Sequence, residues 1–141
     1  MENNKITVLL VDDEPQFRLL LSEVFSREGW HILTATQGAE ALAVLSKEKV
    51  DIVVSDIYMP IMNGLRLRDT MRQDPKLKEI PVLFISGYSD EMTMAAVHSP
   101  KIEGFLQKTK PPQDIIRWVR YLATPIEKRV GLSPGDFGMM R

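Results

Sequence analysis

Acidic residues follow two apolar segments of the chain. Asp51–Ser55 leads directly to Asp56, and Ile6–Val11 leads to Asp12 and Asp13. If both segments are parallel strands, their carboxyl ends lie at one edge of the sheet, where open parallel sheets place their functional crevice. Three carboxylates sharing that crevice would form a divalent-cation site beside an oxygen nucleophile.

Two other apolar segments end in complementary groups. Pro81–Ser86 ends on the Ser86 hydroxyl, and Gly104–Gln107 leads to the ammonium group of Lys108. We therefore expect the three carboxylates, this hydroxyl and this ammonium to lie close together. Lys108 and a cation could hold the added negative charge if Asp56 accepted a phosphoryl group, and Ser86 could donate a hydrogen bond to that group.

The charge of the three carboxylates predicts which cofactor binds. At about 4 Å, two like charges repel by several kcal/mol even at an effective dielectric near 20. Either one carboxyl group is protonated or a cation lies among them. Carboxylate and carbonyl oxygens suit Mg²⁺, and with Mg²⁺ and Lys108 the formal charges cancel. Mg²⁺ is therefore the expected cofactor.

Each of these residues also has a simpler explanation. An Asp after a strand is usually a turn former or a helix cap, so Asp12 and Asp13 could only cap a helix that opens at Pro15. Ser86 could be a turn residue before Gly87. Complementary groups at four strand ends of one crevice favour the functional interpretation over these separate ones.

Strands and helices alternate along the chain. Apolar, β-branched runs predict strands over Ile6–Val11, Trp30–Ala35, Asp51–Ser55, Pro81–Ser86 and Gly104–Gln107. Helical spacing predicts helices from Pro15 to a stop at Gly29, over Gly38–Lys49, from Asn63 or Gly64 to Gln73, over Asp90–His98 and over Pro112–Leu122. This alternation predicts an α/β fold, a doubly wound five-stranded parallel sheet with helices on both faces.

The length and the composition indicate how the chain is divided into a domain and a tail. The 141 residues fit one domain, which we assign to residues 1–123. Residues 124–141 are rich in Pro and Gly and are expected to be a C-terminal tail or the start of a linker, too short for a second domain.

The charge and the cysteine content exclude several partners. With 18 basic and 19 acidic side chains the net charge is -1, which argues against direct binding to nucleic acid or to an anionic membrane. Cysteine is absent, so disulfides and thiolate metal sites are excluded. No signal region or membrane-spanning run stands out, and we expect a cytoplasmic domain.

Four short motifs carry a resemblance to a known family. They are VLLVDDE at residues 8–14, DIYMPIMNG at 56–64, ISG at 85–87 and FLQK at 105–108. In this order and spacing the sequence, over about residues 5–122, resembles the receiver domain of two-component response regulators. The resemblance implies a flavodoxin-like strand order of 2-1-3-4-5.

The resemblance also implies residue roles. Asp56 would accept a phosphoryl group from a sensor histidine kinase or a phosphotransfer protein. Asp13 and Asp56 would bind Mg²⁺ directly, Asp12 through water, and Tyr58 through its backbone carbonyl. Ser86 and Lys108 would contact the phosphoryl group, and Phe105, with Ser86, would form the switch. The fourth helix, fifth strand and fifth helix would bind a second copy or a downstream protein.

Two features depart from the family pattern. The family usually has proline after its lysine, whereas Thr109 follows Lys108, and a second candidate, Lys110, precedes Pro111. We prefer Lys108 because its spacing from Phe105 matches the family. Bulky Tyr58 and Tyr88 stand two residues after Asp56 and Ser86, where water must approach, so we expect slow autodephosphorylation.

Two other functions compete with this interpretation. A phosphohydrolase of haloacid-dehalogenase type also uses an aspartate nucleophile, but it needs an acidic residue two positions later, where this chain has Tyr58. A flavodoxin-like cofactor binder needs a first loop that accepts a phosphate, and Asp12 and Asp13 would repel it. We therefore expect a signalling module, not an enzyme.

Overall fold

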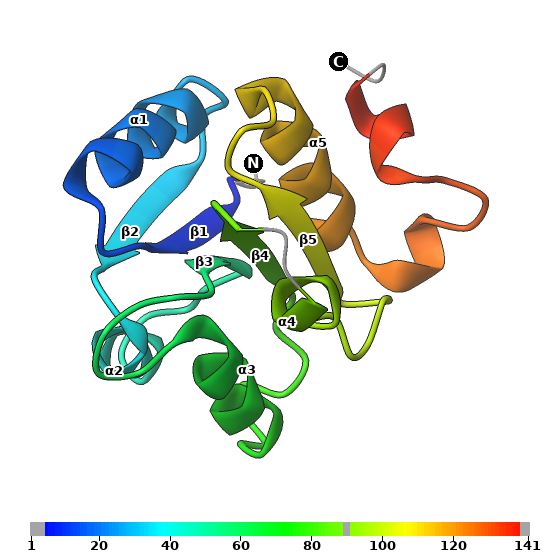
Figure 1. Cartoon of the computed structure of the whole chain (residues 1–141). Helices are drawn as coiled ribbons and strands as arrows, with labels where there is room; N and C mark the ends of the chain where they lie inside the picture. The colour runs from blue at the N-terminus through cyan, green and yellow to red at the C-terminus, as the bar shows by residue number, and fades with distance from the viewer. Residues whose placement is uncertain (1–4, 89–90, 139–141) are drawn as a thin grey trace.

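The fold is a five-stranded parallel sheet with helices on both faces, as predicted (Figure 1). The computed structural model describes residues 5–88 and 91–138. The strands are β1 (Thr7–Val11), β2 (His31–Ala35), β3 (Ile52–Asp56), β4 (Val82–Ser86) and β5 (Glu103–Gln107). They lie in the order β2-β1-β3-β4-β5, and every neighbouring pair is parallel.

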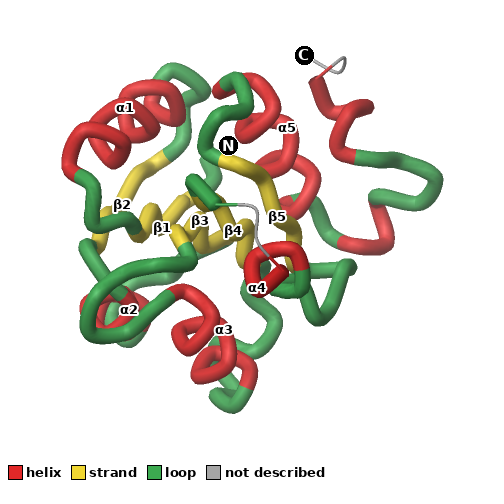
Figure 2. The backbone as a smooth tube through the Cα atoms, viewed as in Figure 1, coloured by secondary structure: helices red, strands yellow, loops and turns green. Residues whose placement is uncertain are grey.

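The helices form two layers (Figure 2). Helices α1 (Pro15–Ser26) and α5 (Pro112–Ala123) cover one face of the sheet, and α2 (Gly38–Leu45) and α3 (Gly64–Arg72) cover the other. The short helix α4 (Glu91–Met94) precedes β5. Since β3 and β4 lie between these layers, all of their residues are buried, which explains their nearly continuous apolar sequences.

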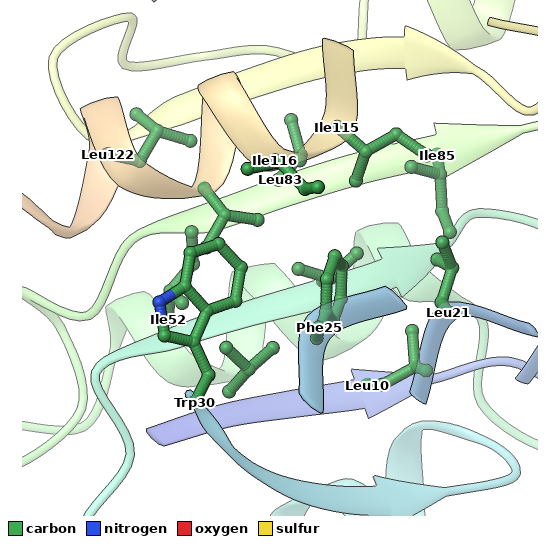
Figure 3. Close-up of a cluster of buried hydrophobic side chains, with 13 residues drawn as sticks. Leu10, Leu21, Phe25, Trp30, Ile52, Leu83, Ile85, Ile115, Ile116 and Leu122 are labelled. Atoms are coloured by element: carbon green, nitrogen blue, oxygen red, sulfur yellow. The ribbon is translucent and has the colours of Figure 1, made fainter. Parts of the chain in front are cut away.

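Alternate residues of the strands enter opposite cores. Leu10, Ile52 and Leu83 point towards α1 and α5, where they meet Phe25 and Ile116 (Figure 3). The intervening strand residues, such as Leu9 and Val53, pack against α2 and α3. This two-sided packing fixes the register of the strands, and it fixes where their polar carboxyl ends emerge.

The helix predicted over Asp90–His98 is shorter in the structure. Asp90 lies outside the described residues, and α4 ends at Met94. The buried carboxylate of Glu103 accepts hydrogen bonds from the backbone N–H groups of His98 and Ser99, at 2.8 and 3.2 Å. These bonds satisfy two backbone N–H groups that a longer helix would have paired within itself. The second predicted helix, Gly38–Lys49, likewise ends earlier, at Leu45.

The segment after α5, expected to be a tail or linker, folds back onto the domain. It forms two short 3₁₀ helices, η1 (Ile126–Lys128) and η2 (Pro134–Gly138), and η2 packs against α5. Residues 139–141 lie outside the described part of the chain. Whether residues 1–123 form a domain by themselves stays a prediction.

No helix within residues 5–88 and 91–138 is long and apolar enough to cross a bilayer.

Candidate functional site

The acidic residues meet at the carboxyl edge of the sheet. Asp12 directly follows β1 and Asp56 ends β3, and the pairing of Val11 with Ser55 places these two strand ends side by side. Carboxylate oxygens of Asp12, Asp13 and Asp56 lie within 4.8 Å of one another. Asp12 and Asp56 are buried, whereas Asp13 is exposed. The structure therefore brings together the three carboxylates that the sequence singled out.

The backbone around Asp56 is held from several sides. Its Oδ1 accepts a hydrogen bond from the N–H of Ile57 at 2.7 Å, and its backbone carbonyl accepts one from the Ser55 hydroxyl at 2.7 Å. Gly64, the first residue of α3, lies against this carbonyl so closely that a Cβ there would be 2.1 Å from the oxygen. Asn63 caps α3 by accepting the Arg66 N–H. The DIYMPIMNG segment thus fixes the orientation of the Asp56 carboxylate.

Lys108 reaches the same cluster from the end of β5. Its Nζ lies 3.0 Å from Asp56 Oδ2, 2.9 Å from Asp12 Oδ2 and 2.5 Å from Glu14 Oε1. Lys110 is exposed in the turn that follows. The preference for Lys108 over Lys110 therefore agrees with the observed geometry.

Two neighbours of Lys108 had no role assigned from the sequence. Glu14 belongs to the acidic run that the sequence showed, but only the fold reveals its ion pair with Lys108. The Phe17 ring lies 4.7 Å from Nζ and offers its face to the cation. Nothing in the sequence signals the Phe17 contact, because it joins α1 to Lys108, which is far away in the chain.

Burial dominates the electrostatics of the carboxylates. Desolvation raises the pKa of Asp56, partly opposed by its hydrogen bond to Lys108. Desolvation also raises the pKa of Asp12, opposed by the N–H of Glu14 and by Lys108. Burial lowers the pKa of Lys108, but its close contacts with the Glu14, Asp12 and Asp56 carboxylates outweigh burial, so the net shift is upward. Lys108 therefore stays charged, while Asp12 and Asp56 are costly to ionise.

The residues fit a divalent cation. Asp12 Oδ2 is buried and accepts no well-directed hydrogen bond, although Lys108 Nζ approaches it at 2.9 Å. A buried carboxylate oxygen with unused lone pairs, beside two more carboxylates, has the chemistry that Mg²⁺ binds. The acidic triad Asp12, Asp13 and Asp56 could therefore hold a metal ion.

The remaining predicted residues surround this centre. Ser86 is fully buried at the end of β4, where its hydroxyl oxygen accepts the N–H of Tyr88 at 3.1 Å. Phe105 is half-buried on β5 against the core beneath α2 and α3. Tyr58 and Tyr88 are both exposed and meet edge to face, with ring centroids 5.1 Å apart. The aromatic pair joins the loops that follow β3 and β4.

The fold and this cluster define a response regulator receiver domain, and the chain belongs to that family. The family model matches residues 8–120. The receiver-domain resemblance that the motifs carried is thereby confirmed.

Individual relatives agree with this assignment. An uncharacterised 14.6 kDa protein of Leptolyngbya boryana is 32% identical over 116 residues, which are 82% of this chain and 88% of that protein. The sensor histidine kinase RcsC of Escherichia coli is 44% identical over 72 residues, or 51% of this chain, but the match spans only 8% of RcsC. The activity and partners of such a larger protein do not carry over.

A solved structure bears on the metal. The response regulator TrrA of Thermotoga maritima, in complex with Mg²⁺–BeF, matches with a TM-score of 0.70 and 30% identity, covering 83% of this chain and 98% of that one. The described residues of the present chain hold an acidic triad that fits the same kind of cation.

Proposed function

We propose that this chain is the phosphoacceptor of a two-component phosphorelay and that Asp56 receives the phosphoryl group. The supporting observation is the position of the Asp56 carboxylate, at the end of β3 with Lys108 Nζ at 3.0 Å and two other carboxylates within 4.8 Å. A sensor histidine kinase or a phosphotransfer protein would donate the group from a phosphohistidine. The match to the receiver-domain family favours a signalling module over a phosphohydrolase.

The transfer is a displacement at phosphorus. A carboxylate oxygen of Asp56 forms the new P–O bond while the P–N bond of the donor breaks and its electron pair returns to the imidazole. Lys108 moves its ammonium group from the carboxylates towards the phosphoryl oxygens and holds their added charge. The Ser86 hydroxyl donates a hydrogen bond to one of these oxygens.

Mg²⁺ would be held by Asp13 and Asp56 directly, by Asp12 through water, and by the backbone carbonyl of Tyr58. When bound it neutralises charge on the phosphoryl group during transfer. The Asp12 Oδ2, which accepts no well-directed hydrogen bond, and the raised pKa values of Asp12 and Asp56 support a site whose carboxylates are incompletely neutralised by Lys108 alone.

The output would be a change of surface. Ser86 and Phe105 lie on the neighbouring strands β4 and β5, so a shift of the Ser86 hydroxyl towards the phosphoryl group would be felt by Phe105. The altered surface would be that of α4, β5 and α5, which would bind a second copy or a downstream protein.

The test is phosphorylation by a small donor. The chain is incubated with Mg²⁺ and acetyl phosphate, and its intact mass is measured. We expect one added phosphoryl group on the wild type, none on Asp56→Ala, and normal labelling of Asp74→Ala, whose half-buried carboxylate lies in the turn after α3 and accepts the Lys76 N–H. An unlabelled wild type, or a fully labelled Asp56→Ala, would refute the proposal.

A further inference from the structure

Helix α5 is largely covered after its first two residues. From Asp114 to Ala123 none of its residues is fully exposed, although Arg117 and Arg120 are charged. The sheet and α1 account for the apolar side of the helix, where Ile115, Ile116, Val119 and Leu122 are buried. The folded-back segment accounts for the opposite side, as Figure 1 shows beside α5. A surface that a receiver would offer to partners is therefore occupied by this chain itself.

Aromatic rings carry the first part of this contact. Phe137 of η2 is only 8% exposed and meets Tyr121 of α5 edge to face, with centroids 5.5 Å apart. Tyr121 in turn meets Trp118 at 6.1 Å, and the Trp118 ring packs over Gly104 of β5, where a Cβ would lie 2.3 Å from it. The contact thus runs from η2 through α5 to β5.

Arg129 makes the second contact between the folded-back segment and α5. Although charged, it is 7% exposed, and in the described part of the chain no acidic side chain pairs with it. It donates instead to backbone carbonyls, to Thr124 at 2.8 Å and to Lys101 at 2.7 Å, and its guanidinium lies 4.7 Å from the Tyr121 ring centroid. It therefore caps the end of α5 and ties it to the loop that enters β5.

The segment also reaches the other end of β5. Pro134 and Gly135 of η2 line a cleft of about 240 Å³ together with Leu106 of β5 and Lys110. Lys110 is two residues from Lys108, and its N–H closes the same turn by bonding to the carbonyl of Gln107 at 3.1 Å. Residues 124–138 thus bond to the loop that enters β5 and share a cleft with the turn that follows it.

We propose that residues 124–138 are an intramolecular cover of the β5–α5 surface and that phosphorylation of Asp56 releases it. This proposal rests on the proposed function, since it needs the phosphoryl group to pull Lys108 and move the turn at 108–110. A partner protein that replaces this segment must supply an aromatic ring to Tyr121 in place of Phe137. It must also supply a cation to the end of α5 in place of Arg129. Because coupling between two sites is reciprocal, loosening the cover must in turn favour the phosphorylated state.

The test is hydrogen exchange on the full chain before and after labelling with Mg²⁺ and acetyl phosphate, with labelling read from intact mass. In the wild type we expect exchange of residues 124–138 to rise roughly five- to 150-fold on labelling, the range of a typical coupling energy. Labelling without any change in exchange would overturn the cover while leaving the phosphoacceptor role intact. Absence of labelling would overturn both.

Variants test the reverse direction. Arg129→Ala with Phe137→Ala should raise exchange in the segment without labelling, and should increase the labelled fraction at equal donor concentration. Val130→Ala is the matched control, because Val130 lies in the same segment and is 84% exposed. A double variant with wild-type exchange and labelling would contradict the proposal. If the double variant lacks a cooperative unfolding transition, it is not folded. The comparison of exchange in the labelled and unlabelled wild type then decides the proposal.

Discussion

Replacing Asp56 by Asn should stabilise the metal-free protein. Asp56 is 6% exposed, so its charge has lost most of its hydration. It also lies within 4.8 Å of the oxygens of Asp12 and Asp13. The amide keeps the shape of the side chain and removes the charge, so the variant isolates what that charge costs the folded state.

The magnitude follows from the distances. At separations of up to 4.8 Å and an effective dielectric near 20, each carboxylate pair repels by at least about 3.5 kcal/mol. On the same scale the attraction of Lys108 at 3.0 Å is about 5.5 kcal/mol, so it offsets most but not all of the two repulsions. Burial adds to the remainder, while the exposure of Asp13 weakens its share. We expect Asp56→Asn to raise the free energy of unfolding by about 1–2 kcal/mol.

Urea unfolding at pH 7 and low ionic strength, with EDTA, measures this difference. With Mg²⁺ in place of EDTA the order should reverse, because binding stabilises the wild type by about 2.7 kcal/mol at 100 times its dissociation constant and Asn is a poorer ligand. The exposed acid on α1 supplies the control: Glu23→Gln makes the same charge change and should shift stability by less than about 0.5 kcal/mol. An Asp56→Asn variant less stable than the wild type in EDTA would refute the reasoning.

Three further measurements test neighbouring parts of the site. Burial raises the pKa of Asp56 above the ordinary carboxyl value of about 3.9. In EDTA, the difference in free energy of unfolding between Asp56→Asn and the wild type should therefore shrink as the pH falls from 7 through that raised pKa. A difference that is constant with pH would contradict the assigned cause. Ile61 is a β-branched residue at φ 69 and is 80% exposed, so Ile61→Asn should raise the free energy of unfolding by about 1 kcal/mol in the same urea assay, whereas a loss would show that the turn tolerates Ile without strain. Tyr58→Asn with Tyr88→Ala opens the aromatic pair over the site and should shorten the lifetime of phospho-Asp56 at least several-fold when followed by intact mass; an unchanged lifetime would show that the rings do not restrict water.

Much of the fold and the core of the site followed from local sequence. Alternating apolar runs and helical spacing gave the five strands and the places of the helices, because each element needs a regular pattern to bury one or both faces. Parallel strands then force their carboxyl ends to one edge. That single topological fact is enough to predict that Asp12, Asp56 and Lys108 lie together, as they do in the structure.

Only the tertiary structure determined the features that depend on contacts between distant segments. The ion pair of Glu14 with Lys108 joins residues 94 positions apart, and Glu103, which bonds the backbone after α4, pairs with Arg68, 35 positions away. The docking of residues 124–138 depends on Arg129 and Phe137 meeting α5, although their Pro- and Gly-rich sequence resembles a linker. Local patterns specify which element forms, whereas such contacts depend on shapes and unsatisfied backbone groups that exist only after the elements have packed.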